Sequence, residues 1–159
     1  MNKSFDEDIS NTIEKYGDMV RRISFLYFSN KADVEDVFQE VFLQYFLNID
    51  KIHSEEHKKS WLCRVTFNKC KDLYKSFWRK KVVSLDDIEI PFESEEQSEL
   101  ILAVMKLPAE YKNIIYMHYY EGFTIPEIAE VTMKNVNTVY SMLRRAKVKL
   151  KKELGEIEL

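Results

Sequence analysis

The chain of 159 residues is long enough for one medium-sized domain or two small ones. It is 45% hydrophobic and 32% charged, and its three glycines and three prolines argue against a β-rich fold with many tight turns. The formal net charge of −3 is mildly acidic, and we find no signal-type leader and no apolar run that could span a bilayer, so we expect a cytoplasmic protein without membrane insertion.

Helical periodicity dominates the sequence. We expect helices at about 7–28, 32–48, 55–79, 96–106, 109–120, 124–132 and 135–153. The stretch 82–95 has no sustained helical period, contains Pro91 and is acidic, which is typical of a linker. The sequence therefore predicts an all-α fold with two small helical domains, 1–81 and 96–159, joined by the acidic linker 82–95.

The charges are segregated along the chain. Residues 58–81 carry nine basic side chains against one acid, residues 84–99 carry seven acids without Lys or Arg, and residues 144–152 carry six basic side chains without an acid. Charge segregation of this kind concerns binding partners rather than the fold. The acidic total thus contains two basic segments that could each bind an anionic partner.

The second expected helix, 32–48, carries apolar residues on two opposite faces. One face has the pattern of a core: Val34, Val37, Phe38, Val41 and Tyr45. The opposite face combines acids and an amide with two leucines: Asp36, Gln39, Glu40, Leu43 and Leu47. Exposed leucines among acids predict a docking surface for a helix of another protein. The alternative is that Leu43 and Leu47 pack against the first helix.

The third expected helix, 55–79, carries a polar stripe at helical spacing: Arg64, Asn68, Lys71 and Lys75. Trp61 flanks this stripe on one side, and Phe67 and Trp78 flank it on the other. Cations beside aromatic rings suit single-stranded nucleic acid, because its phosphates require charge and its unstacked bases require a flat surface. The alternative is that most of these rings belong to the core, and at least Phe67 is expected to be buried.

Cys63 and Cys70 are seven residues apart in this helix, which separates them by roughly 10 Å and excludes a disulfide between them. With His53 and His57 they could be imagined as zinc ligands of an enzyme, but the spacing fits no usual metal motif. The sequence also contains no glycine loop for phosphates and no convincing nucleophile–base pair. We therefore expect no cofactor, and an enzyme is the weaker alternative.

Residues 123–150 form two short helical patterns that meet at a polar break, as in a helix-turn-helix. Thr124 and Glu127 form a capping box for the first, and Asn135 can cap the second. The preceding helix is expected to pack through four apolar side chains and to end at Gly122; these side chains are Ile114, Ile115, Met117 and Tyr119.

The last helix is amphipathic. Its expected core face consists of Val136, Val139, Leu143, Ala146 and Leu150. The opposite face carries Asn137, Ser141, Arg144 and Arg145, with Thr138 beside them. Polar residues at the start of such a helix can contact base edges, and the cations that follow can contact phosphates. The alternative is an ordinary amphipathic helix with a solvated cationic end.

Together these segments resemble the extracytoplasmic-function sigma factors of bacterial RNA polymerase. "NKADVEDVFQEVFLQYF" is similar to the family's region 2.2, and "WLCRVTFNKCKDLYK" is similar to region 2.3 and its continuation. "LPAEYKNIIYMHYYEGFTIPEIAEVTMKNVNTVYSMLRRAKVKL" is similar to region 4. The three motifs stand in the family's order, and the resemblance extends from about Ile9 to Leu154.

The resemblance implies a sigma factor that directs promoter recognition and transcription initiation. Its expected partners are the β′ clamp and β flap of core RNA polymerase, promoter DNA and an anti-sigma factor. The residues that would dock on the β′ clamp are Asp36, Gln39, Glu40, Leu43 and Leu47. The alternative function is a free-standing helix-turn-helix regulator that acts without polymerase docking.

The resemblance also implies two DNA-binding surfaces. The melted −10 strand would be held by the loop around 50–59 together with Trp61, Arg64, Asn68, Lys71 and Lys75. The −35 element would be recognised in the major groove by Asn137, Thr138, Tyr140, Ser141, Arg144 and Arg145. The acidic linker would thread towards the RNA exit path.

Three positions depart from the family's pattern. Met133 and Asn137 stand where the family has glycine, and Tyr140 stands where it usually has a basic residue. A Met in a turn that needs positive φ is strained, which favours a different turn here. Asn137 could recognise adenine, and Tyr140, at the edge of the core face, is expected to contact only the DNA backbone.

Overall fold

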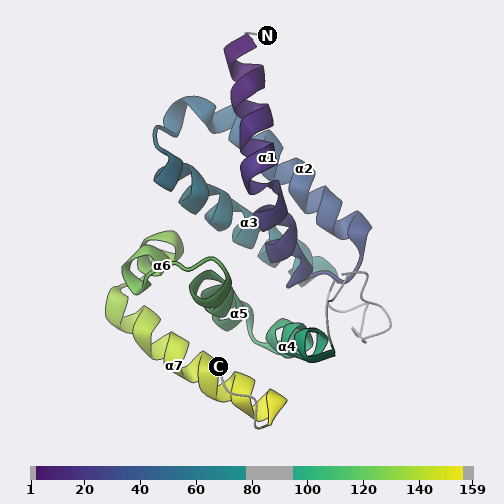
Figure 1. Ribbon diagram of the computed structural model, residues 1–159, viewed down its shortest axis with the longest axis vertical. Coiled ribbons are helices and arrows are strands. Elements are labelled where there is room, and N and C mark those ends of the chain that lie inside the picture. The colour runs from purple at the N-terminus through teal and green to yellow at the C-terminus, as the bar shows by residue number, and fades with distance from the viewer. Residues whose placement is uncertain (1–2, 78–94, 156–159) are drawn as a thin grey trace. The chain divides into compact units, whose positions relative to one another are not determined.

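The computed structural model describes residues 3–77 and 95–155, and every regular element within these residues is a helix (Figure 1). The all-α prediction is therefore confirmed. The chain divides into two compact units, 1–89 and 90–159. Of the predicted linker 82–95, all but Glu95 lies outside the described residues, and Trp78 lies outside them too.

The N-terminal unit consists of three helices: α1 (Lys3–Phe25), α2 (Lys31–Asn48) and α3 (Glu55–Phe77). Each packs against the other two. A short 3₁₀ helix, Ile49–Lys51, follows α2 directly. Helix α2 begins at Asn30, whose side chain accepts a hydrogen bond of 2.9 Å from the backbone N–H of Asp33. This cap satisfies one of the first-turn amides that a helix leaves unpaired.

The core of this unit takes one apolar face from each helix. Val20 and Ile23 of α1, Val37 and Val41 of α2 and Leu62 of α3 are fully buried. The predicted core face of α2 is confirmed except at Phe38, which is half-buried. The guanidinium of Arg21 lies 3.9 Å from the centre of the Phe38 ring and covers it.

Both cysteines belong to this core. Cys63 and Cys70 have no exposed surface and are not joined by a disulfide, as the spacing predicted. The Cys63 sulfur lies 3.6 Å from that of Met19, and the Cys70 sulfur lies 3.9 Å from the hydroxyl of Ser24.

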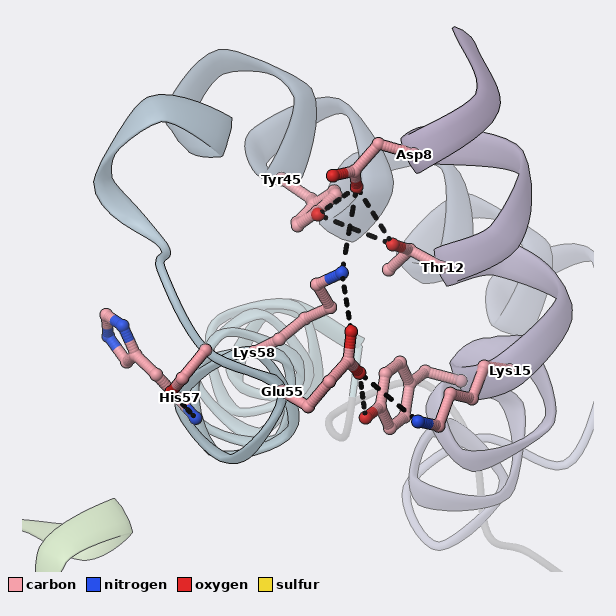
Figure 2. Close-up of polar contacts among 9 residues, drawn as sticks. Asp8, Thr12, Lys15, Tyr45, Glu55, His57 and Lys58 are labelled. Atoms are coloured by element: carbon pink, nitrogen blue, oxygen red, sulfur yellow. Dashed lines mark hydrogen bonds and ion pairs between the residues drawn. The ribbon is translucent and has the colours of Figure 1, made fainter. Parts of the chain in front are cut away.

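A polar cluster joins the three helices near the start of α3 (Figure 2). The hydroxyl of Tyr45 on α2 donates a hydrogen bond of 2.5 Å to the carboxylate of Asp8 on α1. The ammonium of Lys58 on α3 lies 3.7 Å from Asp8 and 3.2 Å from Glu55. Only 13% of the Lys58 side chain is exposed, so its charge is paired within the cluster and is not presented to solvent.

Glu55 is the second anchor of the cluster, between α3 and α1. It accepts a hydrogen bond of 2.8 Å from the Tyr16 hydroxyl and an ion pair of 3.3 Å from Lys15. These contacts, with Tyr16 first and Lys58 next, lower the pKa of Glu55 to about 2. Burial and the same hydrogen bond raise the pKa of Tyr16 to about 12.

The C-terminal unit contains α4 (Glu95–Lys106), α5 (Ala109–Ile115), α6 (Ile125–Thr132) and α7 (Val136–Leu154). Helix α7 packs against each of the other three. One π-helical turn, Tyr116–Tyr120, continues α5. Gly122 then takes the left-handed conformation (φ 68°) that ends the helix, as predicted.

Two predicted caps are confirmed in the helix-turn-helix. The Thr124 hydroxyl accepts from the backbone N–H of Glu127 at 3.2 Å, and the Glu127 carboxylate accepts from the backbone N–H of Thr124 at 3.1 Å. The Asn135 side chain accepts from the backbone N–H of Thr138 at 2.7 Å. These caps fix where α6 and α7 begin.

Two side chains of the predicted core are exposed instead. Tyr119 is 39% exposed, because the π turn has more residues per turn than an α-helix and shifts the face that the 3.6-residue period predicts. Val136 is 46% exposed, and it is the first residue of α7, where the uniform helical period describes the buried face poorly. Met142 takes its place in the core, with Val139, Leu143, Ala146 and Leu150 as predicted.

The turn between α6 and α7 keeps a left-handed residue. Met133 has φ 58° and ψ 37°, and the backbone N–H of Lys134 bonds to the carbonyl of Ala129 at 3.0 Å. The expectation of a different turn is therefore wrong. Met133 keeps this left-handed conformation despite the steric strain of its side chain, because the hydrogen bonds and caps on both sides stabilise the turn.

We expect Met133→Gly to increase the free energy of unfolding by about 0.5 to 1 kcal/mol, because Gly removes the steric cost of the left-handed conformation and loses part of this gain through its own entropy. Urea unfolding of the full chain measures the change. Met133→Ala is the control, because it removes the side chain, which is 81% exposed, and keeps the strain. An equal gain from both variants would contradict this account.

We expect Tyr16→Phe to raise the pKa of Glu55 from about 2 towards its ordinary value of 4.5, because the strongest donor to the carboxylate is lost. Since the folded pKa lies below the ordinary one, the stability that Glu55 contributes is present above pH 4.5 and is lost as the pH falls towards 2. NMR titration of the Glu55 carboxyl carbon measures the pKa. Tyr140→Phe, in the other unit, should leave it unchanged, and an unchanged value in Tyr16→Phe would refute the assignment.

Candidate protein- and nucleic-acid-binding surfaces

The outward face of α2 is apolar and acidic. Leu43 is 51% exposed and Leu47 is 64% exposed, and Asp36 and Gln39 are exposed beside them. Glu40 is half-buried and accepts a hydrogen bond of 3.4 Å from Gln44. The alternative that both leucines pack against α1 is therefore wrong. This α2 face presents two leucines one turn apart, which is the spacing with which one helix binds another.

The polar stripe of α3 lies at the surface in the described residues. Asn68 and Lys75 are exposed, and Arg64 and Lys71 are half-buried. Phe67 is 4% exposed and belongs to the core, as predicted.

Trp61 is half-buried, and its ring meets the ring of Tyr45 edge-on with centroids 6.1 Å apart. The indole is therefore anchored on the core side and only part of it faces solvent. A ring held in this way can offer an edge or a part of its face to an unstacked base without first losing rotational freedom.

In the segment 50–59, which the resemblance assigns to the −10 strand, the predicted start of the third helix at residue 55 is confirmed, and a short 3₁₀ helix occupies part of the predicted break before it. The 3₁₀ helix ends at Lys51 and α3 begins at Glu55, which leaves Ile52–Ser54 as the open stretch. Within this segment Asp50 and His53 are exposed, whereas Lys58 is turned into the polar cluster (Figure 2). Lys58 thus adds to the basic count of the sequence without adding to the accessible charge of the surface.

The outward face of α7 carries every residue that the sequence predicted there. Asn137, Thr138, Tyr140, Ser141, Arg144 and Arg145 are all exposed. Tyr140 is 56% exposed, so it is not part of the core edge.

A basic cavity of about 470 Å³ continues this face towards the C-terminal half of α7. Its lining includes Arg144, Arg145, Lys149 and Lys152, with Tyr111 of α5 on the other side. The Lys149 ammonium lies 5.9 Å from the centre of the Tyr111 ring. Tyr111, Lys149 and Lys152 were not predicted as a group, although the basic run at 144–152 contains the two lysines.

Comparisons with known proteins identify both units. The family model described as "Sigma-70 region 2" matches residues 12–80, and the one described as "Sigma-70, region 4" matches residues 97–150. The RNA polymerase sigma factor SigV of Bacillus subtilis is 31% identical over 131 residues, which are 79% of this chain and 78% of SigV. The chain belongs to the sigma-70 family of RNA polymerase sigma factors, in the extracytoplasmic-function group.

Further relatives agree with this assignment. This sigma factor is 24% identical to the ECF RNA polymerase sigma factor SigW of Bacillus subtilis, over 98% of the chain and 94% of SigW. Its fold is shared with the sigma factor RpoE solved with the anti-sigma factor NepR from Bartonella quintana (TM-score 0.77, 17% identity, 99% and 100% coverage). It is also shared with CnrH in complex with the cytosolic domain of CnrY (TM-score 0.73, 21% identity, 96% and 91% coverage).

The two rival hypotheses lose their support. A free-standing regulator is not favoured, because region 2 is matched as well as the helix-turn-helix of region 4. The imagined zinc site fails on geometry, since His53 and His57 are exposed and the two cysteines are in the core. Within the described residues no three His, Cys, Asp or Glu side chains come together as metal ligands.

The helices were also compared with what a membrane span requires. Across residues 3–77 and 95–155 the helices lack the combination of length and apolar character that crossing a bilayer requires.

Proposed function

We propose that the outward face of α2 is the surface through which this sigma factor docks on the β′ clamp of core RNA polymerase. The exposure of Leu43 and Leu47 carries the proposal, because two accessible leucines among carboxylates are an unfavourable surface for an isolated unit. Asp36, Gln39 and Glu40 would supply the polar rim that orients a partner helix.

We assign the α3 surface to the melted −10 strand. Arg64, Lys71 and Lys75 would meet phosphates, Asn68 would hydrogen-bond, and the exposed part of Trp61 would contact an unstacked base. A base flipped towards Ile52–Ser54 would cost a few kcal/mol of unstacking, which contacts in a pocket must offset.

The proposed role of α7 is recognition of the −35 element in the major groove. Asn137, Thr138 and Ser141 stand in the first two turns, where side chains can reach base edges. Arg144 and Arg145 follow one turn later, where cations can reach phosphates, and the basic cavity extends this charge. Tethering two modest DNA-binding surfaces raises the effective concentration of each once the other is bound.

The proposal includes the setting in which the chain works. We infer a cytoplasmic protein that catalyses no reaction itself and confers promoter specificity on the polymerase. Two proteins that share its fold were solved with an anti-sigma factor or with the cytosolic domain of CnrY. An anti-sigma factor that covers the same surfaces is therefore the regulatory partner that we expect.

Reconstitution tests the function directly. The purified chain, mixed with bacterial core RNA polymerase, should form a stable complex and start transcription at its promoters. We expect Gln39→Ala with Glu40→Ala, or Leu47→Ala alone, to weaken polymerase binding roughly tenfold, because truncating a central contact of an interface typically has this effect.

The matched control for docking is Asn11→Ala with Glu14→Ala. This pair likewise combines an amide and a carboxylate, both of them exposed, but on α1. The control should bind polymerase like the unmodified chain. If the control and the α2 variants bind equally well, the α2 face is not the docking surface.

Arg145→Ala should weaken binding of the holoenzyme to −35 duplex and reduce the slope of log affinity against log salt by about 0.9, because one phosphate contact releases about one counterion. Titrations at several salt concentrations measure the slope. Lys106→Ala is the control, since Lys106 is an exposed cation on α4. An unchanged slope in Arg145→Ala would mean that Arg145 does not touch phosphate.

A further inference from the structure

Two apolar side chains are exposed at the start of α7. Val136 is 46% exposed and Tyr140 is 56% exposed, and they stand four residues apart on one ridge of the helix. The other apolar residues of the first three turns, Val139, Met142 and Leu143, are buried. Val136 and Tyr140, which we call the apolar ridge, are therefore not needed to complete the core.

A polar ridge lies beside the apolar ridge. Asn137 and Ser141 each follow one residue after Val136 and Tyr140, so the two ridges are about 100° apart around the helix and span the same two turns. The cap at Asn135, which accepts from the Thr138 N–H at 2.7 Å, fixes the start of both. Any surface that meets one ridge must also lie close to the other.

The charges of α7 indicate which partner this is. Arg144, Arg145, Lys147 and Lys149 follow the apolar ridge along the helix, and α7 has no acid in its first turn. The ammonium of Lys147 is held 5.4 Å from the centre of the Tyr119 ring. A polyanion is thus attracted to the surface that carries the two apolar side chains.

The major groove of DNA offers one apolar group to such side chains, the C5 methyl of thymine. An amide such as Asn137 pairs with the N6 and N7 positions of adenine. Asn137 of the polar ridge therefore matches adenine, and the apolar ridge matches thymine methyl groups. Both ridges thus favour A·T pairs, and the contacted thymines can belong to either strand.

We propose that Val136 and Tyr140 recognise thymine methyl groups in the −35 element, which makes A·T pairs next to the contact of Asn137 a sequence requirement of this sigma factor. The inference rests on the proposed entry of α7 into the major groove. It assigns to the position of Tyr140 a base contact, in place of the backbone contact that the sequence suggested.

The test begins with the holoenzyme and a pool of duplexes randomised over the −35 element. Selection should enrich thymine, on one strand or the other, at two positions within about one helical turn of DNA. Each selected thymine is then replaced by deoxyuridine, which lacks only the methyl group and keeps its base pairing. We expect each replacement at a contacted position to weaken binding about threefold to fivefold, the effect of losing one buried methyl.

Variants connect each methyl to its side chain. In Val136→Ala the cost of one deoxyuridine should disappear, and in Tyr140→Ala the cost of the other should disappear. Tyr140→Phe should keep that cost, because the ring and not the hydroxyl contacts the methyl. Val148→Ala is the matched control: the same change on the same helix, at a side chain that is 55% exposed and lies about 18 Å further along the axis.

Several results would overturn the inference while leaving the proposed function in place. These are selected elements without thymine, thymines that deoxyuridine replaces at no cost, or a cost that persists in both alanine variants. Variants that weaken binding of core polymerase or an anti-sigma factor, with no effect of deoxyuridine, would make the ridge a protein contact. A holoenzyme that enriches no −35 sequence would refute the proposed role of α7 itself.

Discussion

The hydrogen bond from Tyr45 to Asp8, together with the Lys58 and Glu55 contacts around it, fixes how α2 is rotated against α1 and α3. Helix α2 buries the face of Val34, Val37 and Val41, because burying the opposite face would also bury the carboxylates of Asp36 and Glu40. A directional polar network has one geometry that satisfies all its members, so it reinforces this rotation. Leu43 and Leu47 are exposed as a result, and this rotation therefore presents the α2 surface that we propose for docking.

Features encoded within one turn of a helix could be predicted from the sequence. The Thr124–Glu127 box and the Asn135 cap involve residues three apart, and the core face of α2 follows from a regular period. The side chain of Lys58 could not be placed, because its partner Asp8 is fifty positions away and only the packed helices bring them together. Charge counted along the sequence therefore overestimated the accessible charge of α3.

Errors in the C-terminal unit have a different origin. Tyr119 and Val136 were assigned to the core by a uniform 3.6-residue period, which fails at the π turn and at the first residue of a helix. Met133 was expected to alter its turn because local conformational preference was given too much weight. The Lys134 to Ala129 hydrogen bond and the two flanking caps outweigh the preference of one side chain. The exposed residues of α7 were found because surface polarity repeats regularly on a long helix.

Both cysteines of the chain are fully buried in the N-terminal unit. An oxidant or an alkylating reagent in solution can therefore reach a thiol only in molecules whose region 2 has opened, and never through region 4. Oxidation or alkylation of either cysteine is thus governed by the rate and extent of that opening. Any partner that holds region 2 closed, whether polymerase or an anti-sigma factor, would therefore also protect the two thiols from oxidation and alkylation.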